Sequence, residues 1–488
     1  MISVVVDNEL IYPGGDEFFS PHERFPEYPF DQVATKPNAV YGAVRRVFKQ
    51  AGLDAEHYGT AAWNPLGKWI FPGQTVFVLC NFVYHRRRGE SIEQFQSKCT
   101  HGSVIRAVID YIFLAVGPTG RVFFGNAPLQ SCVWTRVLSD TGGQRLEEFY
   151  ASVHAPIESA DLRVSADDRA GSVRAGPVER RCAEGGITVD LGNRSLLSSL
   201  DGHNPRYRVS DYNPDRTEAF HRNGGHQYVL HPHILNCDVI VSIPKLKTHE
   251  KVGVTCAIKG CVGAIARKDC LAHHRRGTPQ QGGDEFRKDT LGFLACLTKF
   301  HDGVQRIRPY TTRGQALRFL LKSLRFLVRR FAPSVNGAWP GNDTCWRMAL
   351  DIARLIAHGK RDGGISPEFQ RPHLALLDGV VGGEGNGPLD SRPVKSGVLV
   401  FADDPAVLDE AAARFMGYDP YLFPIIREAS RLTDLPLYAA PHDRPGQRCA
   451  AIVNGEETTL MNLARFAEHR YRLPTCWQGI ASAGADES

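Results

Sequence analysis

Side chains able to bind an anion and move a proton follow a predicted buried strand at residues 237–243, CDVIVSI. After Pro244 the chain carries Lys245, Lys247, Lys251 and Lys259, together with Thr248, His249 and Thr255. Because ligands of open α/β sheets bind beyond the carboxyl ends of strands, ammonium groups gathered there suit a carboxylate or a phosphate. A desolvated lysine could also be a base or a nucleophile, and the histidine could exchange a proton near neutral pH. A solvated basic loop would have the same composition and is the alternative.

A second candidate segment is residues 374–388, LALLDGVVGGEGNGP, in which we expect a strand to end at Asp378 and a loop to follow. The loop contains Gly382, Gly383, Gly385 and Gly387. Such glycines let the backbone approach a ligand and offer N–H groups to an anion, although a tight turn needs them too. Asp378 and Glu384 are candidate acids or cation ligands. The loop matches neither the dinucleotide-binding pattern nor the P-loop pattern.

The 12 cysteines form no C-x-x-C pair and no paired metal framework. Cys256, Cys261 and Cys270, with His249, His273 and His274, could supply the ligands of an iron–sulfur or zinc site. Cysteines among small apolar residues more often simply pack, so we assign no metal ligand. Scattered free thiols fit a reducing compartment, and an N-terminus with Asp7 and Glu9 but no basic region does not indicate a signal peptide. We therefore expect a cytoplasmic protein.

The segment 303–342 holds eight cations and no acid. Within it, Arg318, Lys322, Arg325 and Arg329 share one face of a predicted amphipathic helix near 315–331. This helix could lie on an anionic membrane surface or bind an acidic partner. The alternative is a surface helix that covers the sheet and keeps its arginines in water.

Several local patterns predict the elements that would position these residues. A strand at 75–82, a helix at 103–113 and a strand at 120–125 form a βαβ unit, which indicates a parallel sheet. Further helices are expected at 43–51 and 406–416, and strands at 374–377 and 397–401. The predicted fold is α/β, a mostly parallel sheet with flanking helices, in two lobes with inserted loops. The lobes are 1–235, with a polar insertion near 160–186, and 236–475, followed by a disordered tail at 481–488.

The composition is that of an ordinary globular protein of 488 residues. Hydrophobic residues make up 42% and charged residues 23%, which excludes a disordered, collagen-like or polytopic membrane chain. With 58 Lys and Arg against 53 Asp and Glu, the net charge of +5 is too small to indicate a nucleic-acid partner. No apolar run approaches the roughly 20 residues of a transmembrane helix.

The two candidate segments together resemble domain-of-unknown-function family 362 (DUF362). The resemblance is carried by IPKLKTHEKVGVTCAIKGCVG, by LLDGVVGGEGNGP followed by GVLVFADDPAVLDEAAARFMGYDP, and by GNDTCWRMALDIARL, within about residues 73–420. Where the family has a strand ending K-P-N, this chain reads Leu79-Cys80-Asn81, so only the asparagine is retained. Asn81 and Thr100 join the candidate binding residues. The cluster-binding segment of some members is absent here.

A looser similarity to lactate racemase-type proteins concerns the lysine-rich segment. In those proteins a lysine in a comparable segment holds a nickel pincer nucleotide and histidines move protons. The similarity implies that Lys259 or Lys245 holds a cofactor or substrate and that His249 is the acid or base. No cofactor is evident from the residues themselves, and a metal or a nucleotide-derived cofactor is an alternative.

The favoured hypothesis is an enzyme that acts on an anionic small molecule by proton transfer, as an isomerase or epimerase does. Its catalytic residues would be His249, Lys259 and Asp378. Its substrate-binding residues would be Asn81, Thr100, Lys245, Lys247, Thr248, Thr255, Gly383, Glu384, Gly385 and Gly387. One alternative is a redox protein with a metal or iron–sulfur centre at Cys256, Cys261 and Cys270. Another is a non-catalytic protein that binds an anion, or a membrane surface through residues 315–331.

Overall fold

The structure is a computed structural model that describes residues 2–155, 157–164, 185–203, 205–209, 212–287, 292–306, 335–438 and 450–479. Most of the polar insertion expected near 160–186 lies outside these ranges. The basic helix expected near 315–331 and the tail at 481–488 lie outside them entirely, so both remain predictions.

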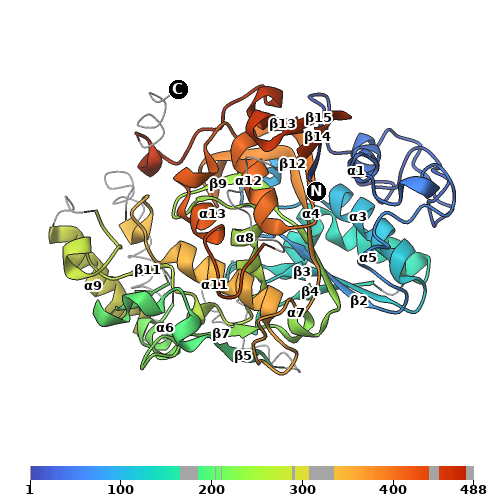
Figure 1. Cartoon of the computed structure of the whole chain (residues 1–488). Coiled ribbons are helices and arrows are strands. Elements are labelled where there is room, and N and C mark those ends of the chain that lie inside the picture. The colour runs from blue at the N-terminus through green and yellow to red at the C-terminus, as the bar shows by residue number, and fades with distance from the viewer. Residues whose placement is uncertain are drawn as a thin grey trace.

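One large mixed sheet of 11 strands runs through the described residues, with helices on both sides (Figure 1). Its main path has the order β15-β14-β1-β13-β12-β8-β2-β3-β4, and β9 is added to β12 and β10 to β9. The strands are β1 Ile2–Val6, β2 Thr75–Cys80, β3 Arg121–Asn126, β4 Ile157–Asp161, β8 Val239–Ile243, β9 Lys245–His249, β10 Gly253–Val254, β12 His373–Asn386, β13 Asp390–Ala402, β14 Ala450–Val453 and β15 Glu456–Thr459. Two small antiparallel pairs lie apart from it, β5 Ile187–Asp190 with β7 Gln227–Leu230, and β6 Tyr207–Arg208 with β11 His274–Arg275.

Helices cover both faces of the sheet, and two further helices pack beside the small β6–β11 pair. The described helices are α1 Ala39–Gln50, α2 Ile92–Gln96, α3 Gly102–Val116, α4 Trp134–Thr141, α5 Gly143–Ser152, α6 Pro214–Phe220, α7 Pro232–Asn236, α8 Cys256–Gly260, α9 Gly292–Arg306, α11 Cys345–His358, α12 Pro405–Phe415 and α13 Pro424–Ala429. Figure 1 shows α1, α3 and α5 on one side of the sheet and α8, α11 and α12 on the other.

Two hydrophobic cores result, one on each face of the sheet. In β2, Val76 and Val78 pack with α1 and α3, whereas Phe77 and Leu79 pack on the side of α8, α11 and α12. Successive side chains of a strand point to opposite faces, so a strand buried on both faces is usually apolar along nearly its whole length. All five residues of β8 are buried, which confirms the prediction made from the β-branched run at 237–243.

The predicted α/β class is confirmed. The strands β2 and β3 pair in parallel from Thr75↔Arg121 to Leu79↔Gly125, with α3 between them in the chain, as the βαβ pattern indicated. The strand β8 pairs in parallel with both β2 and β12. Strands from both sides of the expected lobe boundary therefore share one sheet, and the division into two lobes stays a prediction.

The loop predicted after Asp378 is wrong, because these glycine-rich residues form the second half of β12, which pairs with β13 as far as Asn386↔Asp390. The residues after Pro244 form β9, which is buried at all five positions and pairs in parallel with β12 at Asp378↔Lys245 and Gly383↔Lys247. Local glycine and lysine content predicts neither pairing, and the partner of β9 is distant in the chain. The alternative of a solvated loop is therefore excluded for Lys245–His249.

Several glycines in and just after β12 allow close packing, and Gly387, which follows the last residue of β12, gives a clear test. A Cβ atom on Gly387 would lie 2.1 Å from the Thr248 carbonyl oxygen of β9. We expect Gly387→Ala to lower the free energy of unfolding by about 2 to 3 kcal/mol, since the strands must move apart. Urea unfolding checks the value. The matched control is Gly42→Ala in α1, where nothing lies within 4 Å, and we expect it to stabilise by about 0.5 kcal/mol. Equal effects of the two changes would contradict this account.

Candidate functional site

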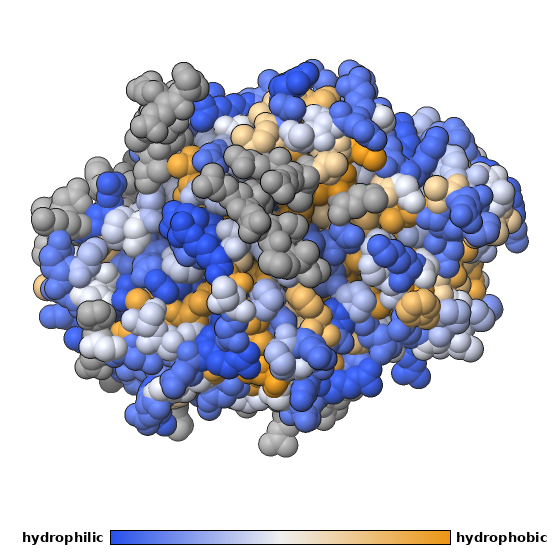
Figure 2. Space-filling view, viewed as in Figure 1, coloured by the Kyte–Doolittle hydropathy of each residue, from blue (hydrophilic) through white to orange (hydrophobic). Residues whose placement is uncertain are grey.

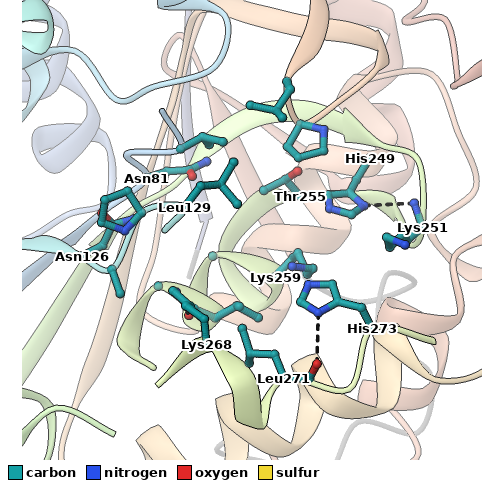
Figure 3. A pocket seen from close by; sticks show the side chains of 18 of the residues that line it. Asn81, Asn126, Leu129, His249, Lys251, Thr255, Lys259, Lys268, Leu271 and His273 are labelled. Atoms are coloured by element: carbon teal, nitrogen blue, oxygen red, sulfur yellow. Dashed lines mark hydrogen bonds between the residues drawn. The ribbon is translucent and has the colours of Figure 1, made fainter. Parts of the chain in front are cut away.

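A cavity of about 480 Å³ lies at the carboxyl ends of the parallel strands. Asn81 follows the last residue of β2, and Asn126 is the last residue of β3. Lys247 and His249 of β9, Lys259 of α8, and Lys268 and His273 of the following segment close the other sides (Figure 3). Apolar side chains complete the wall, among them Phe82, Leu129, Leu271 and Pro388. The cavity is therefore apolar in part and strongly basic at one side.

The strand β9 delivers its polar side chains by alternation. Residues two apart on a strand share a face, so Lys245, Lys247 and His249 point one way and Leu246 points into the core. Of the three, Lys247 and His249 reach the cavity. The pattern K-L-K-T-H thus fixes which side chains can meet a ligand.

Four lysines line the cavity, Lys247, Lys251, Lys259 and Lys268, against one acid, Glu250. The four lysines are at most 9% exposed, so their charges are poorly hydrated. Burial, which removes water from the ammonium group, is the main cause that lowers the pKa of Lys247 and of Lys268 to about 7. Neighbouring lysines lower both pKa values further. An anion entering the cavity would relieve this repulsion.

Three of these ammonium groups donate hydrogen bonds to backbone carbonyls. Lys247 Nζ donates to the Lys98 carbonyl at 2.8 Å, Lys268 Nζ donates to that of Val262 at 3.3 Å, and Lys251 Nζ donates to that of Asn336. Within the described part of the chain, Lys259 Nζ makes no hydrogen bond and no ion pair. Burial also lowers the pKa of Lys259.

Two histidines lie on either side of Lys259 in Figure 3, and their hydrogen bonds fix opposite tautomers. The Nδ1 atom of His249 accepts the backbone N–H of Lys251 at 3.1 Å, so a neutral His249 carries its proton on Nε2. The Nδ1 atom of His273 faces the Leu271 carbonyl oxygen at 3.3 Å and must donate, so Nε2 keeps a lone pair. Burial and the charge of Lys259 lower the pKa of both rings, which keeps them neutral at pH 7.

The helix that carries Lys259 is held in place by a carboxyl group from another helix. Asp409 of α12 accepts the backbone N–H of Ala257 at 2.6 Å and that of Ile258 at 3.0 Å. These N–H groups belong to the first turn of α8 and would otherwise have no partner. Burial raises the pKa of Asp409 to about 8. Cys256, where α8 begins, adopts a positive φ of 38°, which is strained for a side chain with a Cβ atom. The connection to α12 therefore fixes the direction of α8 and of Lys259.

Three wall residues keep a buried polar atom without a hydrogen-bond partner among the described residues. They are Asn81 at Nδ2, Asn126 at Oδ1 and Thr255 at Oγ1. The amide of Asn126 is oriented by its own donor, because Nδ2 donates to the Phe82 carbonyl at 3.1 Å. Buried polar groups normally have a hydrogen-bond partner, so these three atoms are candidate contacts for a ligand.

Lys245 and Asp378, a predicted binding residue and a predicted catalytic residue, do not line the cavity. Both side chains are fully buried, and Lys245 Nζ lies 3.1 Å from Asp378 Oδ1. The Tyr12 hydroxyl donates to Asp378 Oδ1 at 2.6 Å, and the His101 backbone N–H donates to Asp378 Oδ2 at 3.0 Å. The structure gives this pair a structural role, since it joins the N-terminal segment to β9 and β12.

The remaining predicted residues also lie outside the cavity lining and make structural contacts. Thr100 Oγ1 donates to the Ile243 carbonyl at 2.7 Å, and Thr248 Oγ1 donates to that of Gly385 at 2.7 Å. Glu384 accepts the His469 Nε2–H at 2.8 Å and the Arg472 backbone N–H at 2.9 Å, which anchors the C-terminal segment. Gly383, Gly385 and Gly387 belong to β12 or its end, beside β9.

The cavity thus gathers five of the predicted site residues: Asn81, Lys247, His249, Thr255 and Lys259. It adds Asn126, Lys268 and His273, of which the sequence singled out only His273, and only as a possible metal ligand. Asn126 could have been found, because it ends a strand beside the one that precedes Asn81. No local pattern marks Lys268 and His273, which fold back to the cavity after α8.

The three cysteines of the metal-binding alternative are buried apart from the cavity lining. Cys261 Sγ donates to the Ala257 carbonyl at 3.4 Å and Cys270 Sγ donates to that of Arg267 at 3.0 Å. Burial raises the pKa of all three thiols, Cys256 included, so they are not poised as thiolate ligands. Among the residues that the structure describes, no group of three or more His, Cys, Asp or Glu side chains could hold a metal ion.

Fold and cavity together define an α/β protein with a lysine- and histidine-lined cavity at its strand ends. The model of DUF362, a domain of unknown function, matches residues 203–414, and the chain therefore contains a DUF362 domain, as its motifs indicated. The matched range is shorter than the 73–420 suggested by the resemblance. The comparisons do not show the looser similarity to lactate racemase-type proteins.

One relative among curated proteins is a thylakoid-associated protein of Synechocystis sp.. It is 22% identical over 247 residues, which are 51% of this chain and 52% of the relative. The chain thus matches about half the length of that relative. No solved structure matches the chain.

Hydrophilic residues make up most of the face shown in Figure 2, with smaller hydrophobic patches between them. No helix in the described ranges is long and apolar enough to cross a membrane.

The contrast between Lys245 and Lys259 gives a stability test with the same substitution at two sites. Lys245→Met should lower the free energy of unfolding by about 3 to 5 kcal/mol, because it leaves the buried Asp378 carboxylate unpaired. Lys259→Met removes a buried cation that has no such partner, and should cost less than about 1 kcal/mol. Chemical denaturation measures both. In the double variant Lys245→Met with Asp378→Leu, most of the first loss should be regained, and a loss that persists would refute the structural role.

The lowered lysine pKa values predict how stability depends on pH. A lysine with a pKa of about 7 in the folded chain and 10.5 in the unfolded chain opposes folding fully below pH 7. This opposition fades as pH rises from 7 to 10.5, so each such lysine makes stability increase, by at most about 1.4 kcal/mol per pH unit. We expect Lys247→Met or Lys268→Met to reduce the rise measured between pH 7 and 9. The exposed Lys395→Met is the control, and an unchanged slope in the cavity variants would contradict the prediction.

Proposed function

We propose that the chain is an enzyme that binds an anionic small molecule in the cavity and moves a proton on it, as isomerases and epimerases do. The observation that carries the proposal is the pair of neutral histidines beside Lys259, one offering an N–H and the other a lone pair. An acid and a base on either side of a bound carbon are what proton removal and return require.

The lysines supply the binding half of the proposal. Lys247, Lys251 and Lys268 would hold a carboxylate or phosphate, and their charge would also stabilise the negative charge that develops when a carbon loses a proton. The unpaired polar atoms of Asn81, Asn126 and Thr255 offer further hydrogen bonds to a ligand. The apolar wall excludes water, which strengthens these interactions.

The roles differ from those expected from the sequence at one point. His249 keeps the role of acid or base, His273 takes the complementary one, and Lys259 stands between them. Asp378 has no part in the proposal, because its carboxylate is committed to Lys245 and Tyr12.

The predictions about a cofactor, the location and the partners rest on fewer observations. A cofactor held by Lys259 or Lys245 rests only on the looser similarity to lactate racemase-type proteins. A cytoplasmic location, the absence of a nucleic-acid partner and contact of residues 315–331 with a membrane or an acidic partner remain predictions. The name of the Synechocystis relative places that protein at thylakoids, and it makes membrane contact worth testing for this chain.

Isotope exchange tests the proposal without a known substrate. The protein is incubated in heavy water with small carboxylates and phosphates that carry a C–H bond next to a carbonyl or hydroxyl carbon. Mass spectrometry should detect deuterium at that carbon for at least one compound. We expect His249→Asn and His273→Asn each to slow the exchange by at least about a hundredfold, since each removes the acid or the base.

The control is His57→Asn, which changes an exposed histidine paired with Asp54 far from the cavity lining. This variant should exchange at the rate of the unaltered protein, and all three variants should keep its melting temperature. Exchange that is no faster than in buffer for every compound, or that survives both cavity substitutions, would refute the proposal.

A further inference from the structure

Lys259 differs from the other three lysines of the cavity in a way that bears on its chemistry. A carbonyl acceptor stabilises the charged ammonium form of a lysine, and Lys247, Lys251 and Lys268 each have one. Lys259 has none among the described residues, although its side chain is only 8% exposed. The amine of Lys259 is therefore not committed to a contact with any described residue.

We propose that Lys259 is a covalent nucleophile that forms a Schiff base with the carbonyl carbon of a small anionic keto compound. The inference rests on the proposed function, because it names the substrate class and the electron sink of the same site. Its ground is the arrangement of the Lys259 amine beside two histidines, without a hydrogen-bond partner in the described ranges, inside a cavity whose other cations can hold the anionic group of such a compound.

The neighbours of Lys259 supply each proton that the reaction needs. The neutral amine attacks the carbonyl carbon, a C–N bond forms, and the C=O electron pair moves to the oxygen, which accepts a hydrogen bond from the Nε2–H of His249. Nε2 of His273 takes a proton from the attacking nitrogen and passes it to that oxygen, and the carbinolamine forms. The hydroxyl group then takes a proton from a neighbouring lysine ammonium group and leaves as water, and the nitrogen lone pair completes the C=N bond of a protonated imine. No electron acceptor or donor is required.

The Schiff base would explain why a lysine stands between an acid and a base. A protonated imine draws electrons from the adjacent carbon, so a C–H bond at that carbon becomes more acidic. His273, once neutral again, could then remove the proton and His249 could return it. Burial lowers the pKa of Lys259 and so raises the fraction of its amine that is unprotonated, which attack on a carbonyl requires.

The rigid attachment of α8 favours the same role. Asp409 fixes the first turn of the helix through two backbone N–H groups, and Thr255 before it donates its own backbone N–H to the Lys247 carbonyl at 2.9 Å. A nucleophile that is fixed at its base loses less entropy when it reaches the attacking position.

Reductive trapping tests the inference directly. The whole protein is incubated with sodium cyanoborohydride and either pyruvate or dihydroxyacetone phosphate, and digested for peptide mass spectrometry. Cyanoborohydride reduces an imine to a stable secondary amine, so the expected result is an adduct on the peptide that contains Lys259. The two probes distinguish a carboxylate from a phosphate as the anionic group. Acetone, which has no charge, should label at least about tenfold less.

Matched variants complete the test. Lys259→Arg keeps the charge and should abolish trapping, whereas Lys395→Arg, on the surface of β13, should trap as the unaltered protein does. His249→Asn should slow trapping severalfold without changing the melting temperature, because it removes the hydrogen-bond donor to the carbonyl oxygen and not the nucleophile. Adducts that appear only on other lysines, or that persist in Lys259→Arg, would overturn the inference.

Trapping and isotope exchange separate this inference from the proposed function. Exchange without an adduct at Lys259 would overturn the Schiff base and leave the proton transfer in place. An adduct at Lys259 without exchange would support the nucleophile and refute the isomerase-like reaction. The absence of both, with either probe, would overturn both.

Discussion

The pairing of β9 with β12 is the interaction on which the cavity depends. It continues the parallel sheet beyond β8 and holds a strand of alternating polar and apolar residues at the sheet's functional edge. The alternation places Lys245, Lys247 and His249 on one face of β9. Along that face Lys245 contacts the buried Asp378, and Lys247 and His249 line the cavity. Close approach of the two strands requires glycine, because a side chain at Gly387 would meet the backbone of β9. The glycine-rich segment of β12 and the lysine-rich strand β9 therefore form one contact.

Burial of several cations in one cavity conflicts with folding, and the rest of the molecule offsets that conflict. Two hydrophobic cores, one on each face of the sheet, hold the strand ends in place. Asp409, itself a buried carboxylate, holds α8 against α12. Sites whose groups are arranged for a ligand commonly lower stability in this way. The lysines are better explained by what they bind than by what they contribute to the fold.

Local patterns predicted the elements whose residues repeat regularly, such as β2, α3, β3, β8 and α12. They failed at the second half of β12, a glycine-rich segment that pairs with β13 in a hairpin. They also did not predict β9, whose partner β12 lies more than 100 residues later in the chain. The same limit applies to the site. Lysines and a histidine after a strand pointed to the cavity, but the sequence could not separate Lys245, which pairs with Asp378, from Lys247, which does not. Lys268 and His273 lie in the segment after α8, which returns to the cavity and whose sequence has no periodic pattern.

The order of the strands also bears on how such a domain can be inherited. The residues that match DUF362 begin after β2 and β3, yet β8 lies between β2 and β12 in the sheet. Without the earlier strands, β8 would present an unpaired edge of five buried residues, four of them apolar, and the cavity would lack Asn81 and Asn126. The matched region is thus one portion of a larger sheet and not a module that can be moved by itself. A protein that keeps only this portion must cover that edge of β8 with some other strand. The new strand would supply different residues to one wall of the cavity and would thereby change which ligand binds.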